Sequence, residues 1–127
     1  MKISQSYKSS VQARKQRKYR FEAAAHSRHK MMSANLSKEL RKKYSRRSFP
    51  LRKDDTVKIM SGNFKGKTGK ILIVNMEKLK IYIEGIQRSK RDGTKVNVPI
   101  DPSNVQIISL ELEDKKRRKS MERKIKK

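Results

Sequence analysis

The sequence of 127 residues contains no cysteine, no tryptophan and no long run of apolar residues. Without cysteine the chain can form neither a disulfide nor a zinc finger of the Cys type, and it has no thiol for catalysis. Because it has no apolar spanning segment and no apolar signal region at its start, we expect a soluble intracellular protein or a component of an intracellular particle. The basic segments also lack the Trp, Phe and Leu face of an interfacial helix, so no membrane partner is expected.

Acidic residues are scarce. Asp and Glu number 12 against 36 Lys and Arg, which gives a formal net charge of +24 at pH 7. A charge this large repels itself unless a polyanion neutralises it, so nucleic acid is the expected partner. Hydrophobic residues make up only 33% of the chain, which is too little for all of it to fold as one compact globule.

Charge divides the chain into three parts. Residues 1–53 hold 17 Lys and Arg against two acids, residues 54–110 hold 10 against six, and residues 111–127 hold nine against four. Most of the Val and Ile lie in the middle part. We therefore predict a basic N-terminal extension with short helices (1–53), a central domain with the core (54–110) and a basic C-terminal tail (111–127).

The central part is expected to consist of strands, since Val57 and Ile59 alternate with polar residues. The predicted strands cover residues 56–61, 70–75, 80–84, 94–98 and 105–110. Five short strands with tight turns are typical of a small SH3-like barrel. The predicted fold class is thus mainly β, with basic, partly helical extensions on a small barrel.

Gly62, Gly66 and Gly69 lie close together between the first two predicted strands. Glycines this close suggest a loop that needs positive φ or a close approach of two backbones. The loop lysines are free to face an anion, but lysines that only keep a hairpin soluble explain the pattern equally well. A nucleotide-binding P-loop is rejected, because the glycine spacing is one residue short and a strand follows instead of a helix.

A basic finger is predicted between residues 84 and 94, where Asp92-Gly93 is a signal for a hairpin turn. It carries Arg88, Lys90 and Arg91 and could reach into a partner. In the N-terminal extension, residues 9–20 could turn helical but offer no face to bury. Tyr19 and Phe21 could stack on unpaired bases, although packing against the domain is favoured.

Ser37 has the chemistry of a helix cap ahead of residues 38–44. Leu36, Leu40 and Tyr44 are spaced by four and form one apolar stripe, which we expect to lie on the barrel. The C-terminal tail is either a disordered solvated segment or a helix that forms on contact with a polyanion, and the sequence leaves both readings open.

No constellation of residues points to catalysis. The two histidines, His26 and His29, lie in the basic extension and have no third metal ligand in sight. No Ser/His/Asp arrangement is present, and the few acids are most simply surface charges. We expect no enzyme, no cofactor, no metal site and no small-molecule substrate.

The central hairpin and its flanks resemble a known family. Val57-Lys58-Ile59-Met60-Ser61-Gly62, with Lys65-Gly66 and Gly69-Lys70-Ile71, is similar to a KOW motif, the barrel hairpin of several RNA-associated families. Leu36-Ser-Lys-Glu-Leu-Arg-Lys-Lys-Tyr44, Arg47-Ser-Phe-Pro50 and Pro102-Ser-Asn-Val105 resemble the large-subunit ribosomal protein family numbered twenty-four in bacteria and twenty-six in eukaryotes. The basic arm and tail match the eukaryotic and archaeal branch, and the eukaryotic type fits best.

The resemblance implies a structural, non-catalytic component of the large ribosomal subunit in the cytoplasm, assembled in the nucleolus if eukaryotic. It implies binding to the 5′ region of large-subunit rRNA near the polypeptide exit tunnel, a role in assembly, and neighbouring large-subunit proteins as further partners. Gly62, Gly66 and Gly69 would shape the loop. The rRNA contacts that we expect are Arg14, Lys15, Arg17, Lys18, Arg20, Arg28, Lys30, Arg41, Lys42, Arg46, Arg47, Lys58, Lys65, Lys67, Lys70, Arg88, Lys90 and Arg91.

Two other classes compete with this reading. A KOW-type transcription elongation factor usually adds an α/β domain that grips RNA polymerase, and residues 1–53 are too basic and too poor in apolar residues to make one. A general RNA-binding protein, such as an RNA chaperone, would bind polyanions indiscriminately. The patterned strands argue against it, since indiscriminate binding needs no fold.

Overall fold

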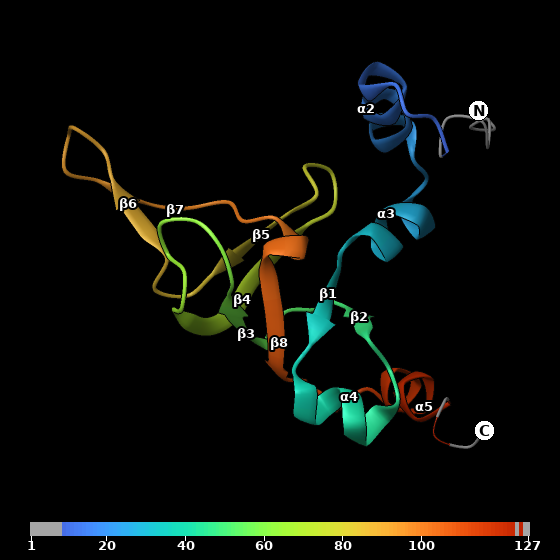
Figure 1. The fold of residues 1–127 in the computed structure, drawn as a ribbon. Helices are drawn as coiled ribbons and strands as arrows, with labels where there is room; N and C mark the ends of the chain where they lie inside the picture. Colours follow the sequence, from blue (N-terminus) through green and yellow to red (C-terminus); the bar gives the residue numbers. More distant parts are fainter. Residues whose placement is uncertain (1–8, 124, 126–127) are drawn as a thin grey trace.

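The computed structural model describes residues 9–123 and residue 125. Among these residues no helix is long and apolar enough to cross a membrane. The helices lie around a central group of strands (Figure 1). They are α2 (Ala13–Glu22), α3 (Ala25–Met31), α4 (Lys38–Tyr44), α5 (Lys115–Glu122) and a short 3₁₀ helix, η1 (Pro102–Asn104).

The described strands form one six-stranded sheet, in the order β2-β1-β8-β3-β4-β5, and a separate ribbon of β6 and β7. β1 and β8 run parallel, and the other neighbours run antiparallel. The strands are β1 (Ser33–Leu36), β2 (Ser48–Pro50), β3 (Thr56–Ile59), β4 (Thr68–Asn75), β5 (Lys80–Ile83), β6 (Gln87–Ser89), β7 (Lys95–Asn97) and β8 (Val105–Ser109). The five predicted strands are confirmed to within two residues at each end.

One hydrophobic core lies against this sheet. Val57 and Ile59 of β3 are buried while Lys58 between them is exposed, as the alternation in the sequence predicts. Ile81 and Ile83 of β5 and Val105 and Ile107 of β8 repeat the same period of two. After the ribbon the chain returns through a bridge between Ile81 and Ile100 and through η1 to β8. These pairings of the described strands do not by themselves close a barrel.

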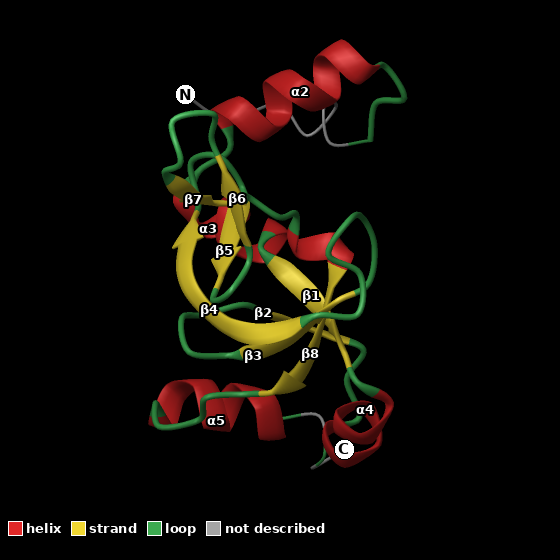
Figure 2. Ribbon diagram, turned by 90° about the vertical axis from the view of Figure 1, so that its left-hand side faces the viewer, coloured by secondary structure: helices red, strands yellow, loops and turns green. Residues whose placement is uncertain are grey.

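Strand β4 is sharply bent. Its register against β5 shifts between Ile71, which faces Ile83, and Ile73, which faces Tyr82. One extra residue on β4 is the mark of a β-bulge, which bends the strand and increases its twist. Figure 2 shows the result, because β4 curves around one side of the sheet.

Three described strands were not predicted from the sequence: β6 in the finger, and β1 and β2. β1 and β2 lie in the segment 1–53 that was predicted as an extension, yet β1 pairs with β8 through Asn35 and Gln106. Leu36, expected in a helical stripe, is in β1 and fully buried. Phe49 and Leu51 are also buried in the core. Ser33–Leu36 contains no β-branched or aromatic residue, and β2 has only three residues. Leu36 also fits the spacing of four with Leu40 and Tyr44, which favoured a helix.

Helix α4 begins where predicted. The Ser37 side chain accepts a hydrogen bond from the Leu40 amide at 3.4 Å, the usual way to satisfy a free N–H at a helix start. Tyr44 is buried and Leu40 is half-buried against the core. The predicted packing of these two side chains is therefore confirmed.

The C-terminal segment folds back onto the protein. Helix α5 begins after Asp114, buries Met121 and brings Arg117 to Asp55. Arg117 is only 5% exposed and donates from both terminal nitrogens to the two Asp55 carboxylate oxygens, at 2.7 and 2.6 Å. The sequence analysis predicted either a disordered tail or a helix formed on a polyanion. In the structure the helix is instead held by a buried ion pair within the protein itself.

Candidate nucleic-acid interface

The loop between β3 and β4 is a compact turn held by its own backbone. The Gly66 amide donates to the Ile59 carbonyl at 2.8 Å, and the Lys65 amide donates to the Gly62 carbonyl at 3.2 Å. Gly62 and Gly66 have φ of +89° and +87°, a backbone conformation that residues with a Cβ rarely adopt. The glycines therefore fix the path of the loop, and Lys65 between them is exposed.

Gly69 serves a different purpose. A Cβ at this position would lie 2.7 Å from the Glu84 carbonyl oxygen and 2.8 Å from Cγ2 of Ile83. Near the start of β4, position 69 thus lies so close to the end of β5 that it has no room for a side chain.

We expect Gly69→Ala to destabilise the fold by about 1–3 kcal/mol, because the backbone at Glu84, directly after β5, must move to make room. Urea unfolding followed by circular dichroism measures this change. Ser61→Ala, at an exposed position of the same loop, is the control and should stay within about 0.5 kcal/mol of the parent. Equal stability of the two variants would contradict the close approach.

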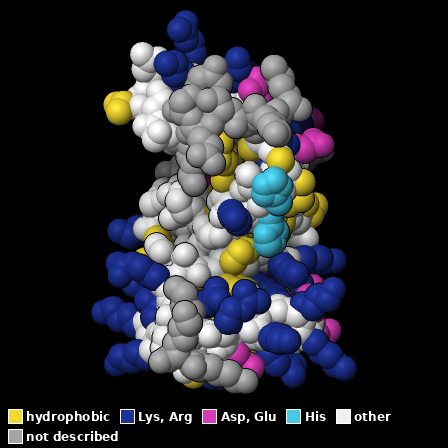
Figure 3. Space-filling model, turned by 90° about the vertical axis from the view of Figure 1, so that its right-hand side faces the viewer, with side chains coloured by type: hydrophobic (Ala, Val, Ile, Leu, Met, Phe, Trp, Pro, Cys, Tyr) yellow, Lys and Arg dark blue, Asp and Glu magenta, His cyan; other side chains and the backbone are white. Residues whose placement is uncertain are grey.

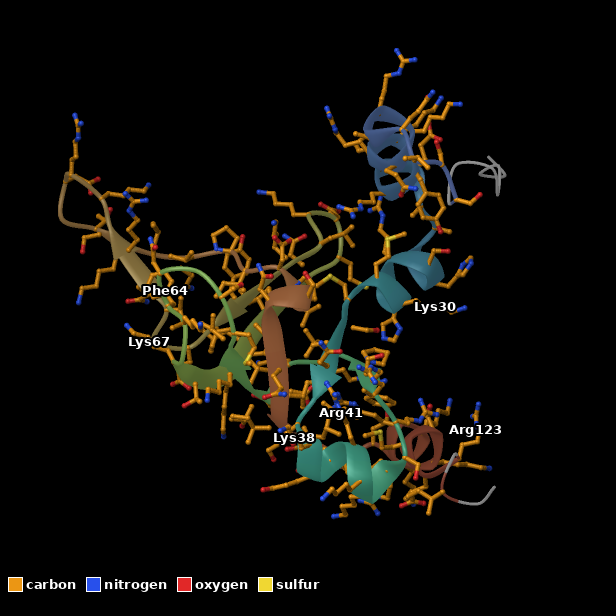
Figure 4. All side chains as sticks on the ribbon, in the orientation of Figure 1. Lys30, Lys38, Arg41, Phe64, Lys67 and Arg123 are labelled. Carbon is orange, nitrogen blue, oxygen red and sulfur yellow. The ribbon has the colours of Figure 1, made fainter. Side chains whose placement is uncertain are left out.

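The predicted loop lysines are all at the surface. Lys58, Lys65, Lys67 and Lys70 are exposed, and none of them forms an ion pair with a residue that the structure describes. The Lys67 ammonium lies 5.2 Å from the centre of the Phe64 ring, and Figure 4 shows the two on this loop. The loop therefore offers uncompensated positive charge beside a half-buried aromatic ring.

The basic finger is the ribbon of β6 and β7, which projects from the sheet (Figure 1). Its turn is organised by Asp92, which accepts from the Thr94 amide at 3.0 Å and the Thr94 hydroxyl at 2.7 Å. These hydrogen bonds, the side-chain one first, lower the pKa of Asp92 below its ordinary value. The three predicted finger cations, Arg88, Lys90 and Arg91, are exposed.

Helix α2 carries five predicted cations and buries no residue. Lys18 lies 3.8 Å from Glu22, a weak pair on the helix surface. The expected packing of Phe21 is wrong, because this residue is 82% exposed. Tyr19 is half-buried and lines a groove of about 380 Å³ between α2 and α3. The cations of α2 are Arg14, Lys15, Arg17, Lys18 and Arg20.

Other predicted contacts have structural duties. Arg28 donates to the Phe21 carbonyl, and Arg41 donates from Nε to the Leu36 carbonyl at 2.8 Å. Arg46 donates to the Ser120 carbonyl of α5 at 2.6 Å and lies over the Phe49 ring. The remaining predicted cations of this region, Lys30, Lys42 and Arg47, are exposed.

The structure brings cations of the N-terminal segment and of α5 to one place. A cavity of about 230 Å³ is lined by His29, Arg46, Arg52, Lys116 and Arg117 around Phe49. Figure 3 shows Lys and Arg concentrated on the part of this face below the histidines. The sequence did not lead us to predict that Lys116 and Arg117 belong to this cluster of cations. The available signal was the spacing of four between Arg117 and Met121, which places both on one face of a helix.

The exposed cations thus come from four places: the β3–β4 loop, the finger, α2 with α3, and the α4–α5 end. No group of three or more potential metal ligands occurs within the described part of the chain. A family model that covers the eukaryotic L26 ribosomal proteins and their archaeal L24 counterparts matches residues 10–124. The chain belongs to this family.

A curated relative supports the assignment. The "Large ribosomal subunit protein uL24" of Korarchaeum cryptofilum (strain OPF8) is 48% identical to this chain over 110 residues, which are 87% of this chain and 84% of that protein. As a member of this ribosomal family, the chain is a structural component of the large ribosomal subunit and not an enzyme. The family model covers both eukaryotic and archaeal proteins, so the eukaryotic type stays a prediction.

In this ribosomal protein the start of α5 depends on a carboxylate. Asp114 accepts from the Lys116 amide at 2.8 Å and from the Arg52 guanidinium at 2.7 Å. The hydrogen bond from Arg52, and then that from the Lys116 amide, lowers the pKa of Asp114 below its ordinary 3.8. A depressed folded-state pKa means that ionised Asp114 stabilises the fold above pH 3.8, and that this contribution is lost as the pH falls through the lower folded-state value.

We therefore expect the Lys116 amide resonance to titrate with a midpoint below 3.8 in an NMR pH series. Asp114→Asn keeps a capping oxygen without the charge and should abolish this titration. A midpoint at or above 3.8 would contradict the capping role.

Proposed function

We propose that this structural protein of the large subunit binds large-subunit rRNA, chiefly through the phosphate backbone. The observation that carries the proposal is the set of exposed cations on a loop and a finger whose backbones are fixed by turns. Lys65 and Lys67 on the loop, and Arg88 and Lys90 on the finger, form no ion pair within the described residues. Positive charge that no described carboxylate neutralises is available for phosphate.

We propose further that residues 54–110 form a KOW-type, SH3-like barrel. Three features support it: the order β8-β3-β4-β5, the bend of β4 at its bulge, and the return of the chain through the bridge at Ile100 and η1 to β8. Residues 1–53 and 111–127 are then basic extensions, which also complete the sheet and the core.

The proposed rRNA contacts are the cations predicted from the sequence that are exposed in these four regions. Arg28, Arg41 and Arg46 join them as residues that both hold the fold and carry charge toward the RNA. Because A-form grooves offer little sequence information to side chains, recognition should depend on shape and backbone. Affinity should then fall with salt by roughly 0.7–0.9 log units per log unit of salt for each phosphate neutralised.

The family resemblance supports more specific proposals about where the protein binds in the large subunit and when it acts. These are binding to the 5′ region of the large rRNA near the exit tunnel, a part in subunit assembly, and contacts with neighbouring large-subunit proteins. The site of action would be the cytoplasmic ribosome, with assembly in the nucleolus if the source is eukaryotic.

Binding to a transcribed 5′ region of large-subunit rRNA tests the proposal against a general RNA binder. The control is a folded RNA of equal length and unrelated sequence, measured over the same salt series. We expect tighter binding to the rRNA fragment at every salt concentration. Equal affinities with equal salt slopes would favour the indiscriminate binder instead.

A further inference from the structure

The outer face of β4 carries an apolar patch that the fold does not cover. The bulge at Leu72 breaks the alternation of the strand, so that Leu72 and Ile73 both reach the surface, 37% and 54% exposed, while Ile71 is fully buried. Met76, in the following turn, is also exposed. Bulges often re-aim side chains for a purpose outside the sheet.

This apolar patch forms one wall of a groove of about 700 Å³. The segment before α5 contributes a second wall, with Glu111, Glu113 and Asp114 among the lining residues. Figure 3 shows hydrophobic side chains next to the two histidines, and His29 is one of the groove residues. The groove therefore combines an apolar wall with a wall of carboxylates.

The electrostatics of the groove differ from those of the rest of the chain. Its cations Arg52 and Arg117 are neutralised by Asp114 and Asp55, at 2.7 and 2.6 Å. Glu111 and Glu113 have no ion-pair partner among the described residues, and Lys53 is the groove's other cation. In a protein of net charge +24, a quarter of the 12 acids thus line one groove.

We infer that this groove docks a segment of a second large-subunit protein, one that carries apolar side chains interspersed with Lys or Arg. Unpaired carboxylates repel RNA phosphate, and exposed Leu and Ile gain nothing from a phosphate backbone. A cationic peptide with apolar side chains complements both walls. The inference deepens the proposed ribosomal function by assigning one face of the protein to protein and the others to RNA.

Site-specific photo-crosslinking in purified large subunits tests the inference. A benzophenone amino acid replaces Ile73 in the full chain, and a matched variant carries it at Lys65 in the β3–β4 loop. We expect the Ile73 variant to form an adduct with a second protein, at a segment that mass spectrometry finds rich in both Lys or Arg and apolar residues. We expect the Lys65 variant to form an adduct with rRNA.

Charge reversal in the groove should weaken the protein adduct. Glu111→Lys with Glu113→Lys should lower its yield roughly tenfold, because like charges then face each other across the interface. Glu39→Lys with Glu84→Lys, which changes net charge equally at exposed positions outside the groove, should leave the yield unchanged.

The outcomes separate this inference from the rRNA proposal. The groove assignment alone would be overturned if position 73 crosslinked to rRNA, to an acidic protein segment or to another copy of this chain. It would also be overturned if position 73 gave no adduct while position 65 labelled rRNA. A cationic protein adduct at position 73, with no RNA adduct at position 65, would instead overturn the proposed loop contacts and leave the groove assignment standing.

Discussion

Arg117→Ala is expected to destabilise the protein by about 3–5 kcal/mol, because it leaves the Asp55 carboxylate buried without its cation. Asp55 is fully buried and Arg117 nearly so. The guanidinium also donates to the Glu111 carbonyl at 2.6 Å and to the Pro50 carbonyl at 3.2 Å, and it lies over the Phe49 ring. One substitution thus releases α5 from β2 and from the residues flanking β3 and β8.

The neighbouring arginine is a matched control. Arg118 is exposed, and its guanidinium donates to the Leu112 carbonyl at 2.8 Å, so Arg118→Ala should cost less than about 1 kcal/mol. Urea unfolding of both variants, followed by circular dichroism, gives the comparison. Arg117→Lys should recover little of the loss, because a point charge cannot replace the two parallel hydrogen bonds.

A double-mutant cycle isolates the pair itself. Asp55→Ala alone leaves a buried guanidinium, so it should also be costly, while the double variant should cost clearly less than the sum of the two single changes. Additive losses, or an Arg117→Ala variant no less stable than Arg118→Ala, would contradict the view that α5 is held by this ion pair.

Replacing Lys65, Lys67 and Lys70 together by Ala should weaken rRNA binding about 100-fold to 1,000-fold at 0.1 M salt. Each phosphate contact contributes roughly 0.7–0.9 to the slope of log affinity against log salt, so three contacts contribute about 2–3, and this contribution fades near 1 M salt. The fold should survive, since all three side chains are exposed. Binding to an rRNA fragment is measured over a salt series.

The control removes the same charge elsewhere. Lys53, Lys78 and Lys119 are exposed and lie outside the proposed contacts, so their joint change to Ala should reduce the slope by clearly less. An equal loss in the two triple variants would mean that only net charge matters. An unchanged affinity and slope in the loop variant would show that the loop faces solvent.

The parts of the fold that the sequence revealed are those with local signals. The alternation of Val57 and Ile59 marked β3, and the side chain of Ser37 marked the start of α4, because each rests on residues a few positions apart. β1 was not recognised because its pairing with β8 joins positions 35 and 106, and because its four residues include no β-branched or aromatic side chain. The partner of Arg117 was equally distant, at position 55.

The groove was hidden for a different reason. Ile71-Leu72-Ile73-Val74 is a continuous apolar run, which is typical of a strand buried on both faces. The bulge that turns Leu72 and Ile73 outward depends on the register of β4 against β5, and no local pattern encodes that register. The cations of the loop and the finger could be located from sequence, whereas the carboxylate wall could not.

The central claim is that this protein is a stable, rRNA-bound component of the large ribosomal subunit. Sedimentation of a cell lysate on a sucrose gradient, with the protein followed by antibody at low and high salt, tests it most directly. The account predicts that the protein co-migrates with large subunits and stays with them through the high-salt wash, because release requires the contacts of all four cationic regions and of the docking groove to break together. Recovery with RNA polymerase, or free at the top of the gradient at low salt, would contradict it.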